Sequence, residues 1–443
     1  MYAAGFFELS TVMTTFTLVP LYIRYVGGGD MAVGVQATVF TLFSVIFRIF
    51  LGPWADIAGR KPSLVLGAAV FATAPLGIWL APNLLIMGFV RVYQAVGMAT
   101  FLSAATSYIA DHTPSEYRGT SLGLYRMSIT FSVMLVPLLG MALIQAYGFW
   151  AYFIMSFAMG AAGFVLMLLL PGDKPCKYAA SRGEVFTNHI SSGDKEGPAA
   201  GHDVRVFAPG EIEARTIAED ERCRGGEVSF SDVKELFTLP ALRYAYSGIL
   251  FISMVAGVLL TYITIYAGAF PSIGNPAVYF TLKAGAGAGA SILFGALSDR
   301  YGRRPFIIAG ICCLAAGLLA LVYLHVMPLP LFILSGLLTG TGFTAALSLL
   351  VASVVDAVPP RTRGTALAFQ ESAIDSGNTV GIFFFGLTVG FMGYGNLFLV
   401  LAIFIAGVPF LSHFISGGRR CPGGVQGGTR SGTRGRGYAN NKH

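Results

Sequence analysis

Long apolar runs separated by short polar connections constrain the fold of this chain more than any other feature. The sequence contains about a dozen stretches of roughly 20 predominantly apolar residues, the length that an α-helix needs to cross a bilayer. Charged residues make up only 12% of the 443 residues, whereas soluble domains typically contain about 25%. The pattern therefore predicts an all-α membrane protein rather than a soluble globular domain.

The apolar runs predict twelve transmembrane helices. Their expected bounds are 2–26, 32–54, 63–81, 84–110, 119–146, 148–170, 240–268, 275–298, 306–325, 329–356, 364–390 and 393–415. Arginine and lysine are concentrated in alternate connections, and the opposite connections carry almost no charge. By the positive-inside rule, we expect the basic connections and both termini in the cytoplasm of a multi-pass plasma-membrane protein. No basic segment precedes the first apolar run, so we expect no cleavable signal peptide.

Two polar segments interrupt or follow the apolar runs. Residues 171–237 are rich in charges of both signs and contain no run long enough to span a membrane. We expect them to form a largely disordered cytoplasmic linker between an N-terminal bundle, 1–170, and a C-terminal bundle, 238–415. Residues 416–443 are rich in glycine and arginine and are expected to touch anionic headgroups as a cytoplasmic tail. The same basic tail is only weak support for RNA binding, and we expect no nucleic-acid partner.

One charged hairpin occurs twice. Residues 52–62 read GPWADIAGRKP, and residues 295–305 read GALSDRYGRRP, which is 243 positions later. A second repeat follows each hairpin: Asp111 and Arg118 match Asp356 and Arg363 at an offset of 245. Many secondary transporters are built from such repeats, with the substrate site between the halves near the middle of the bilayer. The sequence therefore predicts two similar six-helix bundles.

The paired hairpins resemble the signature that the major facilitator superfamily carries between helices 2 and 3 and between helices 8 and 9. Residues 91–94, RVYQ, together with Gly97, resemble the helix-4 motif of its proton-coupled members, although Ala95 replaces a usual glycine. Pro137 and Gly140 resemble a degenerate form of the antiporter motif. The resemblance covers nearly all of the chain except the linker and tail. It implies the two-bundle fold and the drug:proton antiporter-like branch.

By this resemblance, the hairpins form a cytoplasmic charge relay that latches one transport state. The expected latch residues are Gly52, Asp56, Gly59, Arg60 and Asp111 in the first half and Gly295, Asp299, Gly302, Arg303 and Asp356 in the second. The first glycine of each hairpin is expected to permit close helix approach, and the second a left-handed turn. The alternative interpretation is a tight loop that carries only the positive-inside charge.

Charged residues inside spans are costly and usually face a cavity or a partner. Glu8 lies in the first span and Arg91 in the fourth, and by the resemblance both spans line the central cavity. The two side chains are therefore expected to pair, with Glu8 taking up and releasing a proton as access alternates. Two alternatives remain: a solvated Glu8 at the membrane interface, and an Arg91 that clamps an anionic substrate.

Span eleven carries two carboxylates on one helix face, Glu371 and Asp375, four residues apart. Two such carboxylates cannot both ionise cheaply, which favours a second proton site. Arg48 lies eight residues before Asp56, and Glu371 eight after Arg363, so equal depth predicts an Arg48–Glu371 ion pair. That pair is either a state-dependent bridge or a static neutralising contact.

Several further polar side chains are candidates for the substrate cavity. They are Arg91, Gln94, Arg126, Gln370 and Tyr22. Arg126 either meets an anionic substrate group or reaches the cytoplasmic headgroups, and Lys283 is expected at the interface. The sequence shows no phosphate-binding loop, which argues against ATP-driven transport, and no cluster with metal-ligand spacing. We therefore expect no enzyme activity, no cofactor and no metal.

Together these features predict a proton-coupled secondary transporter of a small organic solute, acting as a monomer in the lipid bilayer. Export by proton antiport is the favoured direction, with drugs, metabolites or sugars as the substrate class. Two alternatives stay open. One is uptake by proton symport on the same fold, and the other is a transport-inactive sensor or scaffold that signals through the linker.

Overall fold

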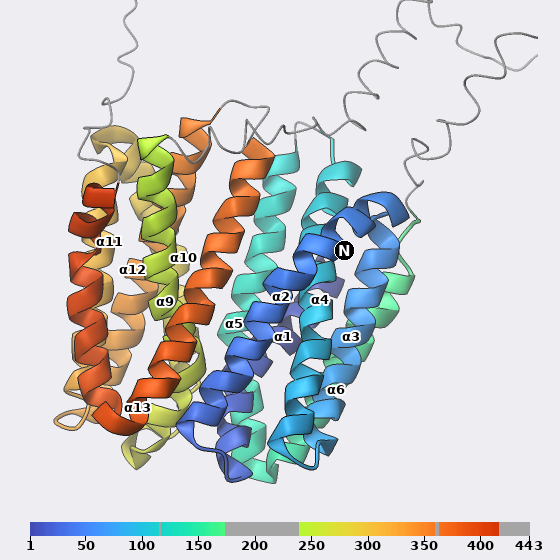
Figure 1. Cartoon of the computed structure of the whole chain (residues 1–443), viewed down its shortest axis with the longest axis horizontal. Coiled ribbons are helices and arrows are strands. Elements are labelled where there is room, and N and C mark those ends of the chain that lie inside the picture. The colour runs from blue at the N-terminus through green and yellow to red at the C-terminus, as the bar shows by residue number, and fades with distance from the viewer. Residues whose placement is uncertain (115–116, 173–238, 359–362, 416–443) are drawn as a thin grey trace, which may run out of the picture.

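The chain folds into a bundle of long helices, seen from the side in the computed structural model of Figure 1. The structure describes residues 1–114, 117–172, 239–358 and 363–415, without some side chains at the helix ends. The first half contains α1 (Tyr2–Tyr25), α2 (Asp30–Ala58), α3 (Arg60–Leu80), α4 (Leu84–His112), α5 (Arg118–Tyr147) and α6 (Phe149–Leu168). The second half contains α9 (Pro240–Gly268), the short 3-10 helix η2 (Pro271–Ile273), α10 (Val278–Tyr301), α11 (Arg303–Val322), α12 (Pro328–Ala357) and α13 (Arg363–Ile415).

Helices are the expected backbone form, because lipid offers no partner to an exposed amide or carbonyl. Within the described ranges, eleven helices are long and apolar enough to cross a membrane. The longest of them, α13, leaves helical geometry at Gly393, where φ is 77°. Its two limbs meet at the bottom of Figure 1 and each runs from there toward the top, so α13 crosses twice. The described helices thus make the twelve predicted passes.

The helices extend further into the charged hairpins than the sequence predicts. A single glycine separates α2 from α3 and α10 from α11, where loops of several residues are expected. Gly59 has a φ of 97° and Gly302 a φ of 86°, a backbone region that side-chain-bearing residues rarely adopt. Gly148 and Gly393 make matching joints later in each half. Polar residues continue the helices because these ends need not lie in the apolar layer.

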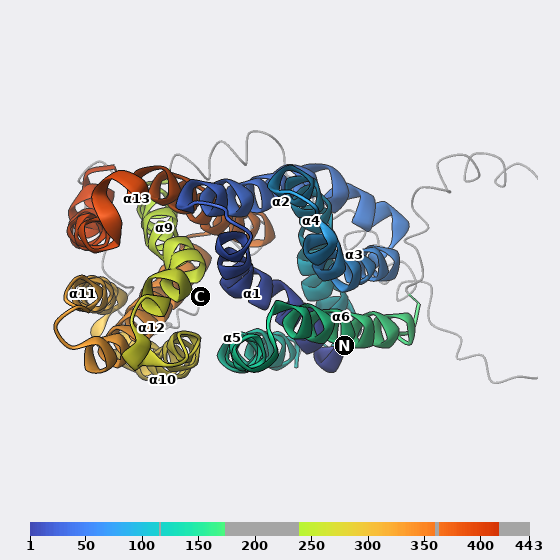
Figure 2. The ribbon, with the colours of Figure 1, turned by 90° about the horizontal axis from the view of Figure 1, so that it is seen from below.

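The two halves lie side by side when the molecule is viewed along the helices (Figure 2). They meet along two seams, α2 against α13 and α5 against α10, and α1 packs against α9 between them. We call the end of the bundle that carries residues 172 and 239 the linker end. Toward this end α2 and α13 diverge, as Figure 1 shows.

The halves share a hydrophobic core only toward the end opposite the linker. One cluster of buried apolar residues joins Leu18 and Ile23 of α1 to Leu259 and Ile263 of α9. A second cluster, which includes Leu9 of α1, belongs to the first half alone and lies nearer the linker end. Burial of apolar surface therefore holds the halves together at one end and leaves them separate at the other.

The linker and the tail, predicted as 171–237 and 416–443, lie almost wholly outside the described residues.

Candidate functional site

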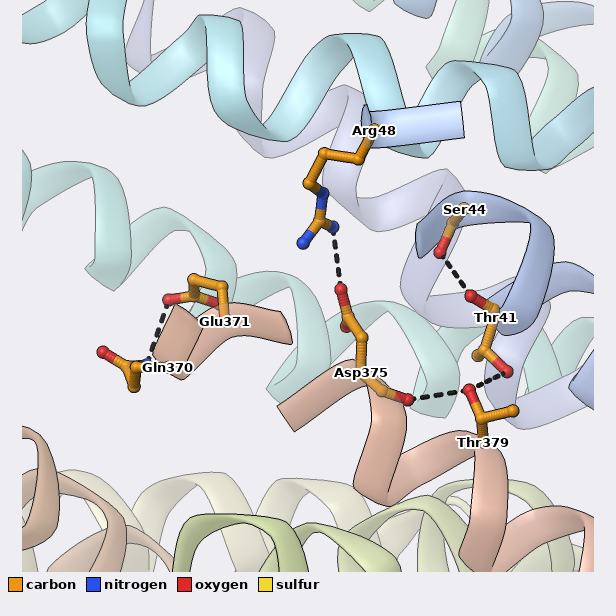
Figure 3. A network of polar contacts seen from close by, with 7 residues as sticks. All are labelled: Thr41, Ser44, Arg48, Gln370, Glu371, Asp375 and Thr379. Carbon is orange, nitrogen blue, oxygen red and sulfur yellow. Dashed lines mark hydrogen bonds and ion pairs between the residues drawn. The ribbon is translucent and has the colours of Figure 1, made fainter. Parts of the chain in front are cut away.

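One ion pair joins the two halves through α2 and α13. The Arg48 guanidinium lies 2.8 Å from the Asp375 carboxylate, and both side chains are largely buried. The hydroxyl of Thr379, one turn further along α13, lies 2.8 Å from that of Thr41 on α2. Figure 3 shows Arg48 pointing at Asp375, with Glu371 turned away beside Gln370. These contacts form a polar bridge between α2 and α13.

The predicted Arg48–Glu371 pair is therefore wrong by one helical turn. Counting eight residues from each hairpin gives the same depth only if α2 and α13 are parallel and begin at the same depth. They diverge toward the linker end instead (Figure 1), so the carboxylate within reach of Arg48 is the one further from that end. Asp375 is this deeper carboxylate.

Glu371 has a different partner across the interface. Arg126 of α5 lies 3.8 Å from its carboxylate, and the Gln370 amide donates to the same group over 3.3 Å. The Arg126 side chain is 71% exposed, so this pair is more open to solvent than the Arg48 pair. Each carboxylate of α13 thus meets its own arginine of the first half, one on α2 and one on α5.

Glu8 is fully buried, and its carboxyl oxygens have no hydrogen-bond partner. A Cβ placed on Gly163 of α6 would lie 2.6 Å from Glu8 Oε1, so the carboxyl group occupies the space that this glycine leaves. The burial rules out the solvated interfacial Glu8 that the sequence left open. Glu8 faces α6 inside the first half.

Arg91 is also buried, at 2% exposure, but it does not pair with Glu8. Its guanidinium donates to Gln94 Oε1 over 3.0 Å and lies 5.8 Å from the Phe40 ring centroid. The expected Glu8–Arg91 pair is absent from the ion pairs of the described residues. The reason is depth: Glu8 lies near the linker end of α1, whereas Arg91 lies near the opposite end of α4.

Hydrogen bonds close the interface at the end opposite the linker. Tyr394 donates to the Asp30 carboxylate over 2.6 Å, and the Gln145 amide donates to the Gly274 carbonyl over 2.8 Å. Thr281 of α10 donates to the carbonyl of Met134 on α5. These contacts coincide with the shared hydrophobic core, so this end of the interface is sealed. No sequence pattern predicts these contacts, because most of them involve backbone carbonyls.

The remaining predicted cavity residues lie in different surroundings. Tyr22 packs in the hydrophobic cluster that the two halves share, and its hydroxyl donates to the Trp79 carbonyl over 3.2 Å. Gln370 is buried beside Glu371, and Gln94 is buried beside Arg91. Lys283, expected at the interface, is 9% exposed instead, and its ammonium lies 5.2 Å from the Phe343 ring centroid. Among the described residues, no cluster of histidine, cysteine and carboxylate side chains has the makings of a metal site.

The hairpin charges form two equivalent ion pairs. Arg60 lies 3.7 Å from Asp111, and Arg303 lies 2.8 Å from Asp356. Each pair joins the start of one helix to the end of the next within a single half, α3 to α4 and α11 to α12. The latch contacts that the structure describes therefore brace each half and do not cross between halves.

The predicted latch also includes Gly52, Asp56, Gly295 and Asp299. The side chains of Asp56 and Asp299, and the surroundings of Gly52, lie outside the described part of the structure. A Cβ on Gly295 would meet none of the described atoms within 4 Å, so the described part of the structure does not have the close helix approach expected at this glycine. The tight turn of this hairpin is made by Gly302, as the sequence predicts.

Comparison with known proteins identifies the family. A sequence model described as Major Facilitator Superfamily matches residues 1–274 and 270–419. The chain belongs to this superfamily. Multidrug resistance protein Stp of Mycobacterium tuberculosis is 23% identical and aligns with 77% of this chain and 66% of its own length. D-xylose-proton symporter-like 3, chloroplastic, of Arabidopsis thaliana is 25% identical and aligns with 78% and 64%. The chain thus spans about two thirds or less of the length of these relatives.

Solved structures agree on the superfamily fold. The nucleoside transporter NupG superposes with a TM-score of 0.70 at 14% identity, over 94% of this chain and 98% of its own. A bacterial homologue of the human lysosomal transporter Spinster, described as inward-facing and unoccupied, gives a TM-score of 0.68 at 18% identity, over 95% and 96%. At these identities the likeness establishes the two-bundle fold alone.

The superfamily hairpin pairs are expected to contribute little to stability. Asp111 and Asp356 are 60% and 63% exposed, and exposed ion pairs stabilise a fold by less than about 1 kcal/mol. Asp111→Asn and Asp356→Asn should therefore leave the melting temperature of the detergent-purified protein almost unchanged. A fall of many degrees in either variant would contradict this expectation and show that the pair contributes much more to stability than an exposed ion pair does.

Proposed function

We propose that this protein is a proton-coupled secondary transporter that moves a small organic solute by alternating access. The observation that carries the proposal is the pair of ion contacts between the halves, Arg48–Asp375 and Arg126–Glu371. Both carboxylates lie on one helix of one half, and both arginines lie on the other half. Any motion of the halves therefore changes the partners of two titratable groups.

These contacts supply the coupling. A protonated carboxylate loses its charge and with it most of its attraction to the arginine. The preference between two arrangements of the halves then depends on whether Asp375 and Glu371 hold protons, which is the differential interaction that a conformational equilibrium needs. Arg48 and Arg126 are left as cations between the halves whenever their partners are neutral. An anionic group on the solute is one candidate to take the place of the neutral carboxylates as the partner of these arginines.

The sealed end and the diverging end define the state of this structure. The end opposite the linker is closed by the shared core and by contacts such as Tyr394–Asp30, and the halves separate toward the linker end. With the linker in the cytoplasm of a plasma-membrane protein, as the basic connections indicate, this arrangement is inward-facing. The hairpin pairs then brace the linker ends of each half, so that each half moves as one body.

Export by proton antiport is the direction we favour. Pro137 and Gly140 of α5 resemble the antiporter motif, and the relative Stp is named a multidrug resistance protein. Uptake by proton symport is the second candidate, because the Arabidopsis relative is named a D-xylose-proton symporter-like protein and a Cryptococcus neoformans relative a myo-inositol transporter. The substrate classes under test are therefore drugs, metabolites and sugars.

Flux in proteoliposomes tests the proposal. The solute is chosen by thermal-shift screening of a library of drugs, metabolites and sugars, because a ligand of the folded state raises its apparent stability. An imposed pH gradient should then drive accumulation of that solute, and an internal pH dye should report proton movement. Inward accumulation with an acidic interior indicates antiport, and with an acidic exterior symport. A solute that binds but never moves would favour a sensor or scaffold instead.

A further inference from the structure

Lys283 of α10 is a buried cation inside the second half. Its side chain is 9% exposed, and a Cβ on Gly340 of α12 would collide with the Lys283 backbone, so α10 and α12 are in direct contact here. The ammonium lies 5.2 Å from the ring centroid of Phe343, which is at the middle of α12, Pro328–Ala357. The cation therefore lies well inside the bundle, away from both of its ends.

The Lys283 ammonium lacks a polar partner in the protein. It has three hydrogens to donate, but no hydrogen bond or ion pair of the described residues includes it. Tyr279, one helical turn away, is committed to Thr339, with the two hydroxyl oxygens 2.7 Å apart. The Phe343 ring contacts the cation on one side only. Because a buried charge without a partner destabilises a fold, this arrangement leaves a place for an anion.

The second half has no carboxylate to spare for this cation. Residues 240–415 contain four carboxylate side chains: Asp299, Asp356, Glu371 and Asp375. The first two belong to the linker ends of α10 and α12, roughly 20 Å or more away by residue count along the helices. The other two pair with arginines of the first half. α5, the first-half helix that packs against α10 in Figure 2, contains no carboxylate at all.

The first half contains a matching cation that does have a polar partner. Arg91 of α4 lies 5.8 Å from the ring centroid of Phe40 on α2, and Lys283 is the residue 243 positions after Phe40. Each half thus holds one cation beside a phenylalanine, between its second and fourth helices. Arg91 donates to Gln94 Oε1 over 3.0 Å. Of the two cations, Lys283 is the one that needs a partner from outside the protein.

We propose that Lys283 binds the anionic group of the transported solute, which makes that solute an amphipathic organic anion with a carboxylate or a phosphate ester. The ammonium donates to the anionic oxygens, and the Phe343 ring contacts the apolar body of the solute. The proposal rests on the proposed transport function and names the chemical class of its solute. The site is separate from Arg48 and Arg126, which keep their own carboxylates in this state.

The anion approaches from the linker end, where the halves diverge. On that side of Lys283, residues 284–290 of α10 alternate between alanine and glycine, so no large side chain of this helix covers the lysine. A Cβ on Gly285 or Gly289 would meet no described atom within 4 Å. The phosphate of a bilayer lipid cannot take the same position, because Phe343 lies at the middle of a helix that spans the membrane.

The stability of Lys283→Met tests whether the ammonium is unpaired. Methionine keeps much of the length of the side chain and removes its charge. We expect the melting temperature of the solute-free protein in detergent to rise by several degrees, because an uncompensated buried charge is lost. Arg303→Met, which removes a cation that is paired with Asp356, should give no such rise. An unchanged or lower melting temperature in Lys283→Met would overturn the proposal.

Thermal unfolding with matched probes tests the anion site. The anions are benzoate and phenyl phosphate, and benzamide is the uncharged analogue of benzoate. At neutral pH and constant ionic strength, both anions should raise the melting temperature of the wild type by several degrees, because they bind the folded state, and benzamide should not. Lys283→Gln should lose this rise, and Lys283→Arg should keep part of it. Equal effects of benzoate and benzamide on the wild type would overturn the proposal, even if Lys283→Gln fails to fold.

Arg126→Gln is the matched control, because Arg126 is another cation on the path between the halves. The benzoate effect should persist in this variant. Its loss there, together with its retention in Lys283→Gln, would assign the anion to Arg126 and overturn the inference. So would an equal rise with sodium sulfate, which would show an unspecific anion effect.

Flux measurements separate this inference from the proposed function. A benzoate effect that depends on Lys283, without pH-driven flux of any solute from the screen, would overturn the proposed function alone. Proton-driven flux of an uncharged solute that is unchanged in Lys283→Gln would overturn this inference alone.

Discussion

Replacing Arg48 with glutamate is expected to abolish proton-driven transport, and adding Asp375→Arg is expected to restore much of it. The single change places two carboxylates face to face at a position where the structure has an ion pair of 2.8 Å. Breaking a buried pair costs about 3–5 kcal/mol. With both partners slightly exposed, we expect the lower end of this range, roughly a hundredfold in the balance between states. The initial rate of solute flux in proteoliposomes measures the effect.

The matched control uses the neighbouring carboxylate. Arg48→Glu combined with Glu371→Arg should not recover transport, because Glu371 pairs with Arg126 and lies one helical turn from Asp375, the partner of Arg48. Both double variants carry the same net charge, so a general effect of charge is held constant. Recovery in the Glu371 combination, but not in the Asp375 combination, would contradict the structure and favour the pairing expected from equal depth.

A disulfide across the sealed end of the interface is expected to stop transport completely and reversibly. Thr281 of α10 donates to the carbonyl of Met134 on α5, a contact between halves that alternating access must break. Met134→Cys with Thr281→Cys, in a background free of the five native cysteines, should form a disulfide bond upon oxidation, since the Thr281 side chain already reaches the Met134 backbone. Flux should fall to the level of empty liposomes and return after reduction.

A disulfide within one half provides the control. Ser63 of α3 donates to the carbonyl of Thr100 on α4 over 3.0 Å, entirely inside the first half. Ser63→Cys with Thr100→Cys should leave flux nearly unchanged upon oxidation, because each half moves as a unit. Loss of flux in both oxidised variants would mean that motion inside a half is also needed, which the rocking mechanism does not include.

The sequence was sufficient for those features that depend on local pattern. Apolar runs place the helices because each run must satisfy its own backbone in lipid. The repeated glycines of the hairpins place the joints, and the structure has the expected positive φ at Gly59 and Gly302. The pairs Arg60–Asp111 and Arg303–Asp356 recur at corresponding positions because the two halves repeat the same residues at a nearly constant offset.

The partners of the intramembrane charges could not be predicted from local sequence pattern. Counting residues gives depth along a helix but neither its tilt nor the direction in which a side chain points. Arg48 therefore meets Asp375 rather than Glu371 because α2 and α13 diverge. Glu8 faces Gly163 of α6, which lies 155 positions later in the sequence, and no periodicity in α1 distinguishes that face.

Asp375 lies in the interface between the halves, so its partner depends on the state of the transporter. Asp375→Asn should therefore uncouple the motion of the halves from pH.

Alternating access itself is tested most directly by two distances measured on the same protein. In the cysteine-free background, spin labels at Tyr117 and Tyr301 report the linker end, and labels at Tyr25 and Val326 report the opposite end; all four positions are exposed. Electron–electron resonance in lipid discs is recorded across a range of pH, with and without the solute from the screen. With alternating access, we expect the linker-end distance to shorten under the same conditions in which the opposite-end distance lengthens. Two distances that stay fixed, or that change in the same direction, would contradict it.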